Sequence, residues 1–266
     1  MRKTTLISLA LAALPVFGTA GPFDDLASVE ILPGWRNAAG EHMAGLRITM
    51  DEGWKTYWRA PGDGGIPPQF SLTGSENITG FTPHWPVPEL FYQNDMYSVG
   101  YENSVVFPLR LYSVDPEAPM RISGQIHIGV CEEICIPVTL DFDELLPVEG
   151  ERDAAITAAL INRPLTADEA NVGTVICRID PISDGLQVTT VIDVPPMAAK
   201  EFVVVEAGDA HVWVSEADIA RDGNRLSATV DMVHHTGEAF ALDRTAVRIT
   251  VLGDNQAIDI QGCAAG

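Results

Sequence analysis

The strongest constraint on the fold is a succession of short runs in which apolar and polar residues alternate. Such alternation is typical of strands that bury one face, because successive side chains of a strand point to opposite sides. Glycine, proline and asparagine separate the runs, most densely in Ala60–Pro68, and these residues favour turns. In the first half of the chain the runs are Leu46–Met50, Val105–Val114, Arg121–Val130 and Cys135–Phe142.

The second half contains further runs of the same kind, spaced about ten residues apart. They are Gly173–Asp180, Gly185–Val194, Glu201–Ala207, Ala210–Glu216, Arg225–Val233, Thr245–Gly253 and Gln256–Gly262. This number and spacing of runs predict a β-sandwich of immunoglobulin-like size.

One segment between the halves has a helical pattern instead. In Glu151–Asn162 the apolar residues Ile156, Ala159 and Leu160 fall on one face of a helix, and Pro164 follows the pattern and ends it. We interpret this helix as the connection between two domains.

The first twenty residues have the features of an export signal. Arg2 and Lys3 form a positive start, Leu6–Phe17 is apolar but about half the length of a membrane span, and Gly18–Ala20 is a small-residue cleavage site. No later stretch reaches eighteen consecutive apolar residues, so we expect no membrane insertion of the exported chain.

The sequence therefore predicts an all-β protein with two immunoglobulin-like β-sandwich domains joined by a short helical linker. We expect a signal peptide in residues 1–20, a first sandwich in 21–147, the helical linker in 148–170 and a second sandwich in 171–266. The formal net charge of −21 argues against nucleic acids and anionic membrane surfaces as partners, because their fields repel an acidic protein.

Four cysteines in an exported chain indicate disulfides. Cys131 and Cys135 are close in sequence, whereas Cys177 and Cys263 lie near the two ends of the second domain, so we expect the pairs Cys131–Cys135 and Cys177–Cys263. The second pair closes a long loop and should stabilise the domain by roughly 4 kcal/mol, which favours a structural role.

The first pair has the geometry of a hairpin tip. If Cys131 ends one strand and Cys135 begins the next, Glu132–Ile134 form a three-residue loop and the cysteines face each other about 4.5–5.5 Å apart between Cα atoms. A bridge across so short a loop stabilises little, so disulfide exchange at an exposed tip is a better interpretation than a structural bond. The two adjacent glutamates disfavour thiolates and so favour a reductant.

Two other interpretations stay open. The pair can be a local structural disulfide, or it can bind copper(I) together with His127, which shares a strand face with Cys131, and with Met96. Against the metal site, a strand pair spreads its ligands and a second cysteine pair of zinc-site spacing is missing. The histidines at 234 and 235 are interpreted as part of a turn.

The aromatic residues Trp54, Tyr57 and Trp58 can form a stacking platform for a partner or fill the edge of the core. We favour the core, with Arg59 and Asp63 paired across the neighbouring turn.

Four motifs resemble the amino-terminal periplasmic domain of the thiol:disulfide interchange protein DsbD, especially its copper-sensitivity-suppressor branch, ScsB. They are "GWKTYWRAPGDGGIPP" (Gly53–Pro68), "HWPVPELF" (His84–Phe91), "YSVGYENSVVFPLRL" (Tyr97–Leu111) and "GVCEEICIPVTLDF" (Gly129–Phe142). The resemblance covers most of Gly34–Pro147 in order, and the second domain resembles the longer extracytoplasmic part of that branch.

The resemblance implies a periplasmic thiol–disulfide oxidoreductase of protein-disulfide reductase type, without a cofactor. It implies that Cys135 attacks or accepts in the mixed disulfide, that Cys131 resolves it, and that a cap loop at Asp95, Met96 and Tyr97 shields the pair. The implied partners are thioredoxin-fold periplasmic proteins and a membrane electron carrier, which we expect to be a separate protein. Copper tolerance is also compatible with the family.

Overall fold

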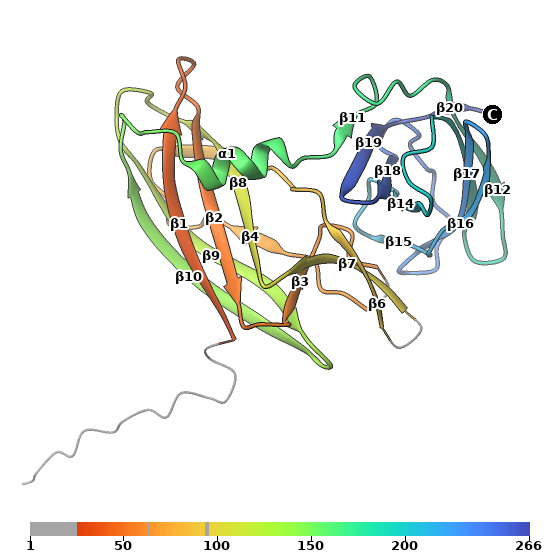
Figure 1. The fold of residues 1–266 in the computed structure, drawn as a ribbon, viewed down its shortest axis with the longest axis horizontal. Helices are drawn as coiled ribbons and strands as arrows, with labels where there is room; N and C mark the ends of the chain where they lie inside the picture. The colour runs from red at the N-terminus through yellow and green to blue at the C-terminus, as the bar shows by residue number, and fades with distance from the viewer. Residues whose placement is uncertain (1–25, 63, 94–95) are drawn as a thin grey trace, which may run out of the picture.

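The computed structural model describes residues 26–62, 64–93 and 96–266, and within them it consists of two β-sandwiches and one helix (Figure 1). The predicted signal peptide and the predicted cap residue Asp95 lie outside these residues. The predicted fold class, two immunoglobulin-like β-sandwich domains, is confirmed.

The first sandwich packs two antiparallel sheets around one apolar core. One sheet has the strand order β1-β2-β8-β5, and the other has the order β10-β9-β3-β7-β6 with β4 also paired to β9. Alternate residues of the strands fill the core, including Leu46, Trp58, Phe107 and Ile126, all fully buried. The strands are β1 (Ala27–Arg36), β2 (His42–Met50), β3 (Lys55–Tyr57), β4 (Gln69–Ser71), β5 (Ile78–Pro83), β6 (Glu89–Gln93), β7 (Met96–Glu102), β8 (Ser104–Ser113), β9 (Met120–Cys131) and β10 (Cys135–Leu146).

The second sandwich has its own core, which contains Cys177, Val188, Leu226 and Ile249. Its sheets have the strand orders β11-β19-β18-β14 and β15-β17-β13-β12-β20, with β16 also paired to β17. The predicted runs all contain strands, whereas β11, β16 and β20 were missed: β11 and β20 have only two residues each, and β16 is flanked by charged residues with little apolar sequence. The strands are β11 (Leu165–Thr166), β12 (Val175–Pro181), β13 (Leu186–Asp193), β14 (Phe202–Glu206), β15 (Val212–Val214), β16 (Asp218–Asp222), β17 (Arg225–His234), β18 (Arg248–Gly253), β19 (Gln256–Gln261) and β20 (Ala264–Ala265).

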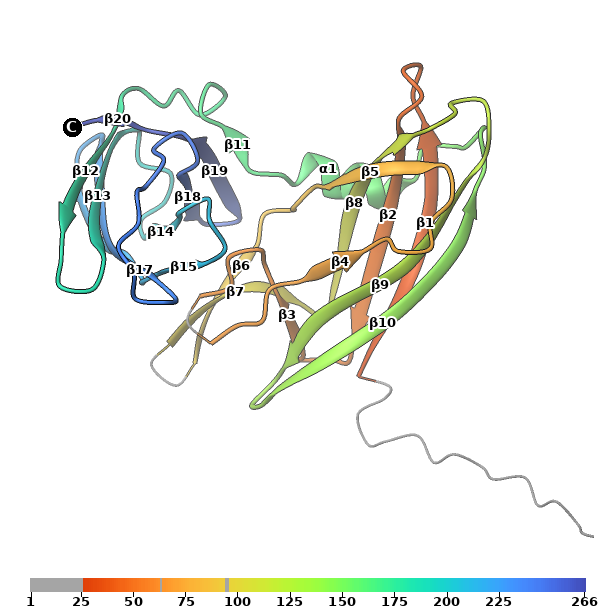
Figure 2. The same cartoon turned by 180° about the vertical axis from the view of Figure 1, so that it is seen from behind.

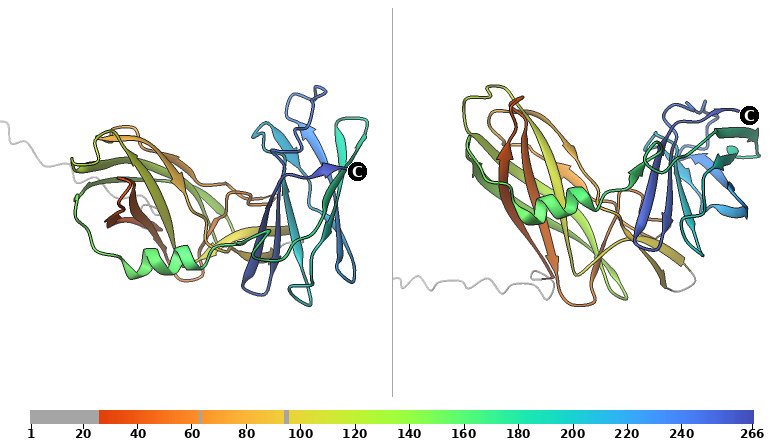
Figure 3. Two further views of the ribbon diagram at one scale, coloured as in Figure 1. Left: turned by 90° about the horizontal axis from the view of Figure 1, so that it is seen from above. Right: turned by 45° about the horizontal axis from the view of Figure 1, so that its top comes forward.

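The helix α1 (Ala154–Ile161) is shorter than predicted and lies against the first sandwich (Figures 1 and 3). It begins after Asp153, whose carboxylate accepts hydrogen bonds from the backbone N–H groups of Ala155 and Ile156 and so satisfies two free donors of the first turn. Ile156 is fully buried, close to Gly45 of β2. No helix in the described part of the chain is long and apolar enough to cross a membrane.

The two sandwiches share an apolar interface (Figure 2). Leu252 of β18 and Ala257 of β19 are buried in the same apolar cluster as the core of the first sandwich, and Phe202 and Val204 of β14 pack against it. One face of the sheet that contains β14, β18 and β19 therefore covers the first domain. Burial of this face stabilises one relative arrangement of the domains.

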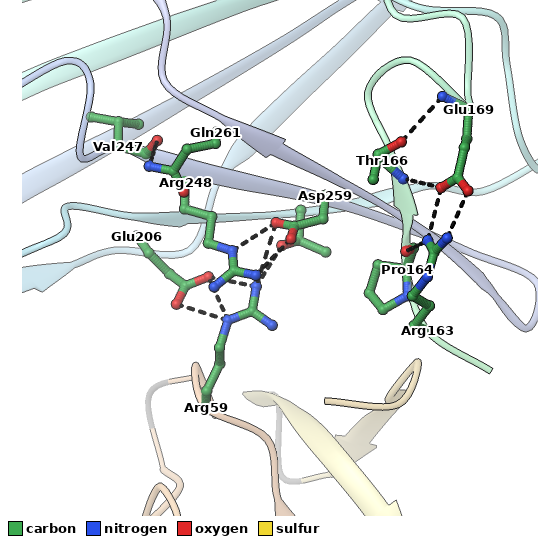
Figure 4. Close-up of polar contacts among 11 residues, drawn as sticks. Arg59, Arg163, Pro164, Thr166, Glu169, Glu206, Val247, Arg248, Asp259 and Gln261 are labelled. Carbon is green, nitrogen blue, oxygen red and sulfur yellow. Dashed lines mark hydrogen bonds and ion pairs between the residues drawn. The ribbon is translucent and has the colours of Figure 1, made fainter. Parts of the chain in front are cut away.

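A buried arginine lies at the centre of this interface (Figure 4). Arg59 follows β3 in the first domain, and its guanidinium donates to the Glu206 carboxylate at 3.0–3.2 Å and to Thr250 Oγ1 at 3.1 Å. It also lies 3.8 Å from Asp259, which Arg248 holds by two further bonds. The predicted partner within its own turn, Asp63, lies outside the described residues, and the acidic partners of Arg59 among the described residues come from the second domain.

Candidate functional site

The cysteine hairpin is formed by β9 and β10, which pair in antiparallel register along their whole length. Cys131 ends β9, Cys135 begins β10, and the two face each other with their Cα atoms 4.2 Å apart and their sulfurs bonded. The three residues between them form the loop, as the spacing predicted. The hairpin projects from the end of the first sandwich (Figure 2).

The two cysteines differ in exposure. Cys131 is 1% exposed, whereas Cys135 is on the surface. The expectation that both sulfurs lie at an exposed tip is therefore wrong for Cys131, because β9 lies between β10 and β3 in the sheet at this point and the Tyr57 hydroxyl contacts the Cys131 sulfur. Only the Cys135 side of the bond is open to another protein.

A tyrosine hydroxyl contacts the disulfide. The Tyr57 hydroxyl lies 3.0 Å from Cys131 Sγ and 3.0 Å from Cys135 Sγ, so it can donate its proton to either sulfur. Burial raises the pKa of Tyr57 above its ordinary value, so the hydroxyl keeps that proton at neutral pH. The contact supplies a hydrogen-bond donor at the place where a thiolate forms when the bond is reduced.

Two glycines make room for the tyrosine ring. Gly129 lies two residues before Cys131 on β9 and therefore on the same face of the sheet, where a Cβ atom would come within 3.2 Å of the Tyr57 ring. A Cβ atom at Gly65 would come within 2.7 Å of the opposite side of the ring. The glycine-rich turn and the glycine before the cysteine thus hold Tyr57 against the sulfurs.

A row of paired residues runs across the sheet from the cysteines. Lys55 of β3 is opposite Cys131 on one side and opposite Glu102 of β7 on the other. The Lys55 ammonium donates to Gln93 Oε1 at 2.9 Å and lies 5.0 Å from the centre of the Phe91 ring. Lys55 therefore connects the neighbourhood of Cys131 to the β6–β7 hairpin.

The predicted cap residues lie farther along that hairpin. Tyr97 is five residues before Glu102 on β7, which places it roughly 16 Å along the strand from the level of Cys131. Its ring packs between Tyr92, at 4.7 Å, and Phe202 of the second domain, at 5.3 Å. Met96 is 49% exposed.

His127 is not brought to the cysteines. It lies four residues before Cys131 on β9, roughly 13 Å away along the strand, and its Nδ1 lies 2.8 Å from Thr139 Oγ1 on β10. Among the residues that the structure describes, no group of three His, Cys, Asp or Glu side chains could hold a metal ion as they stand. The geometry thus offers no observation that favours the copper interpretation at this hairpin.

The second disulfide joins Cys177 of β12 to Cys263, which lies between β19 and β20. Cys177 is fully buried in the core of the second domain. Its surroundings are those of a structural bond.

Sequence reasoning missed Tyr57 and Lys55 as residues of the site. Trp54 and Trp58 pack in or against the first core, as we interpreted them, but Tyr57 points to the other face of the sheet because it is one residue from Trp58 on a strand. The available signals were Gly129, which leaves space on the face that carries Cys131, and Gly65, which leaves space on the other side of the tyrosine ring.

Comparison with known proteins agrees with this geometry. Residues 28–147 match the family described as "Thiol:disulfide interchange protein DsbD, N-terminal". The fold is similar to the crystal structure of the N-terminal periplasmic domain of ScsB from Proteus mirabilis, with a TM-score of 0.69, 24% sequence identity, and coverage of 93% of this chain and 97% of that chain. No curated protein matches the chain.

The resemblance predicted from the four motifs is therefore confirmed. The family match covers the first sandwich, including the cysteine hairpin and Tyr57. The structural likeness extends through both sandwiches, and at this level of identity it shows that the two-domain fold is shared.

Proposed function

We propose that this chain, whose residues 28–147 belong to the family of DsbD N-terminal domains, is an exported thiol–disulfide exchange protein of the periplasm. It receives reducing equivalents from a separate membrane electron carrier and passes them to thioredoxin-fold proteins through Cys131 and Cys135. The reaction is protein-disulfide reduction, in which the cysteine sulfurs carry the electrons and no organic cofactor is required.

The observation that carries this proposal is the unequal exposure of two bonded sulfurs that share one hydroxyl donor. Cys135 is open to a partner, Cys131 is buried, and the Tyr57 hydroxyl lies 3.0 Å from each. Disulfide exchange needs one accessible sulfur, one protected resolving sulfur and stabilisation of the thiolate that leaves. A structural bond across so short a loop needs none of these.

Reduction of a partner takes two displacements. The Cys135 thiolate attacks one sulfur of the partner's disulfide, a bond forms between them, and the partner's other sulfur leaves as a thiolate that takes up a proton. The Cys131 thiolate then attacks Cys135 Sγ and releases the partner's first sulfur, which is protonated in turn. The partner gains two electrons and two protons, and the Cys131–Cys135 bond is formed.

Recharging runs in the opposite direction. A thiolate of the electron carrier attacks Cys135 Sγ, because this sulfur is the accessible one, and Cys131 leaves as a thiolate. The Tyr57 hydroxyl donates to that thiolate in a buried position, where a hydrogen bond to a charged group is worth more than in water. The second thiol of the carrier then displaces Cys135 and completes the transfer of two electrons.

The β6–β7 hairpin is the proposed cover of the pair. A reductant in an oxidising compartment needs protection from adventitious oxidation, and this hairpin neighbours β3, the strand that pairs with β9 at Cys131. Its contacts with the site run through Phe91 and Gln93 to Lys55. Tyr97 lies at the same end of the hairpin as Gln93, which pairs with the neighbouring Met96, and its ring packs on Phe202 and so supports the hairpin from the second domain.

Tyr57→Phe is expected to slow reduction of the Cys131–Cys135 bond by about tenfold. The change removes only the hydroxyl, and a hydrogen bond to a charged group contributes about 1.5–3 kcal/mol, of which 1.4 kcal/mol corresponds to a factor of ten. The rate of reduction by dithiothreitol, followed by quenched thiol labelling, measures the effect. Tyr112→Phe, which loses a hydroxyl bond to Thr82 far from the cysteines, is the matched control. Equal rates for the two variants would contradict the assigned role of Tyr57.

The reduction potential of the Cys131–Cys135 bond tests the proposed function. Titration with glutathione or dithiothreitol, with thiols counted by mass spectrometry, should place this bond between roughly −200 and −270 mV, where thiol–disulfide carriers lie. The Cys177–Cys263 bond is an internal control in the same chain and should be reduced separately, at lower potential. If both bonds resist reduction together below about −300 mV, the pair is structural and the proposal fails.

A further inference from the structure

Three histidines gather in the second domain, apart from the cysteine hairpin. His211 directly precedes β15, His234 ends β17 and His235 follows it. Because β15 pairs with β17, and the His235 N–H donates to the His211 carbonyl at 2.9 Å, residues more than twenty positions apart are brought side by side. The ring centres lie 4.7 Å apart for His234 and His235, 5.1 Å for His211 and His235, and 6.1 Å for His211 and His234.

The hydrogen bonds of the rings leave the same nitrogen free in each. His211 Nδ1 lies 3.0 Å from the Asp209 carboxylate, and His235 Nδ1 lies 3.3 Å from the His211 carbonyl oxygen. These partners only accept, so in the neutral rings Nδ1 carries the hydrogen and Nε2 has a free lone pair. His234 Nδ1 lies 2.8 Å from Thr236 Oγ1 and accepts a hydrogen bond from the Thr236 backbone N–H at 3.4 Å. The neutral His234 ring therefore carries its hydrogen on Nε2 and has to shift it to Nδ1, with Thr236 Oγ1 as acceptor, before Nε2 can bind a metal. Within the described residues no hydrogen bond involves any of the three Nε2 atoms.

For His211 and His235 this pattern is the one found around metal-binding histidines, which usually donate their other ring N–H to a carboxylate or a carbonyl. The spacing of the rings also fits a metal site. One point lies about 3 Å from all three ring centres. A metal ion is about this far from the centre of an imidazole ring when the zinc–nitrogen bond is about 2.0–2.1 Å. The side chains do not yet enclose an ion as they stand, so the rings have to turn towards that point. His211 and His235 are exposed, which leaves them free to do so.

The surroundings favour a cation. The Asp209 carboxylate is next to His211, and the whole chain carries a formal net charge of −21. His211 and His235 also line a cavity of about 680 Å³ between the domains, which leaves space for a water ligand on the ion.

We propose that His211, His234 and His235 bind one late divalent transition-metal ion, of which Zn²⁺ is the representative, through their three Nε2 atoms. Water completes a four-coordinate site, and Asp209 orients His211 from behind. Imidazole is a ligand that Zn²⁺, Cu²⁺ and Ni²⁺ share, so selectivity among them is a further outcome of the measurement. The site is independent of the proposed redox function, because no cysteine takes part.

The test is calorimetric titration of Zn²⁺ into the untagged protein with both disulfides formed, so that no thiol can ligate the ion. We expect one ion per chain, a loss of affinity of about tenfold or more in Asp209→Asn or His235→Ala, and no binding when all three histidines are replaced. His127→Ala is the matched control and should bind like the unchanged protein, because its ring lies in the other domain. Binding should also weaken at acidic pH, since protonated imidazole cannot ligate a metal.

Thermal unfolding separates a lost site from a damaged fold. In the presence of a chelator the variants should melt like the unchanged protein, and added Zn²⁺ should raise the melting temperature only where the three histidines are intact. If His235→Ala melts early without metal, the more conservative His235→Gln takes its place. The proposal is overturned if the unchanged protein does not bind Zn²⁺, if binding survives loss of all three histidines, or if His127→Ala abolishes it.

Discussion

Cys131→Ser is expected to trap this protein in a mixed disulfide with a thioredoxin-fold partner, whereas Cys135→Ser should abolish exchange. In the first variant the exposed Cys135 still attacks the partner, but no neighbouring thiol releases it. In the second variant the remaining thiol of Cys131 is 1% exposed and out of reach of a protein. Loss of the attacking group should lower the exchange rate by more than about 1000-fold.

The measurement uses the reduced variants and an oxidised thioredoxin, and it counts covalent adducts on a non-reducing gel and by mass spectrometry. The double variant Cys177→Ser/Cys263→Ser is the control, because it removes the structural bond and should retain exchange if it is folded. An adduct formed by Cys135→Ser and not by Cys131→Ser would reverse the two roles and remove the argument from exposure.

Glu206→Ala is expected to lower the free energy of unfolding by about 3 kcal/mol, the low end of the range for breaking a buried ion pair. The Arg59 side chain is 10% exposed, and burial lowers the pKa of Arg59 while the Glu206 carboxylate opposes that change. Without Glu206 the buried guanidinium keeps, among the described residues, Thr250, the Trp58 ring 3.8 Å away and the more distant Asp259, which Arg248 already engages. The uncompensated charge weakens the interface between the domains.

Urea unfolding measures this loss, and two further variants make it specific. Asp143→Ala breaks an ion pair with Arg121 that lies on the surface, and it should leave the free energy of unfolding nearly unchanged. The double change Arg59→Met/Glu206→Leu removes both charges and should recover part of the stability, since neither partner is then left buried alone. If Glu206→Ala is no more destabilising than Asp143→Ala, the interface does not depend on this pair.

Patterns confined to neighbouring residues were read correctly from the sequence. The alternating runs identified four of the ten described strands of the first sandwich and seven of the ten described strands of the second, because the period of two depends only on which face of each strand is buried. The facing arrangement of Cys131 and Cys135 also followed from local spacing, since a three-residue loop between strands leaves little freedom in register.

Features that join distant strands were not readable in this way. Tyr57 reaches the sulfurs because β3 lies between β9 and β7 in the sheet, and the order of strands that are not consecutive has no local signature. His211 likewise comes next to His234 and His235, whose sequence is typical of a turn, only because β15 pairs with β17.

The amino-acid sequence by itself thus determined the all-β class, the two sandwiches and the hairpin that carries the cysteine pair, because each depends on side-chain periodicity or on short loops. Only the tertiary structure decided that Cys131 is buried and Cys135 is open, and that Arg59 finds its carboxylate in the other domain. These outcomes depend on how whole sheets pack. The ion pair joins residues 147 positions apart, and Tyr57 contacts the buried Cys131 from 74 positions away, so no local pattern records either feature.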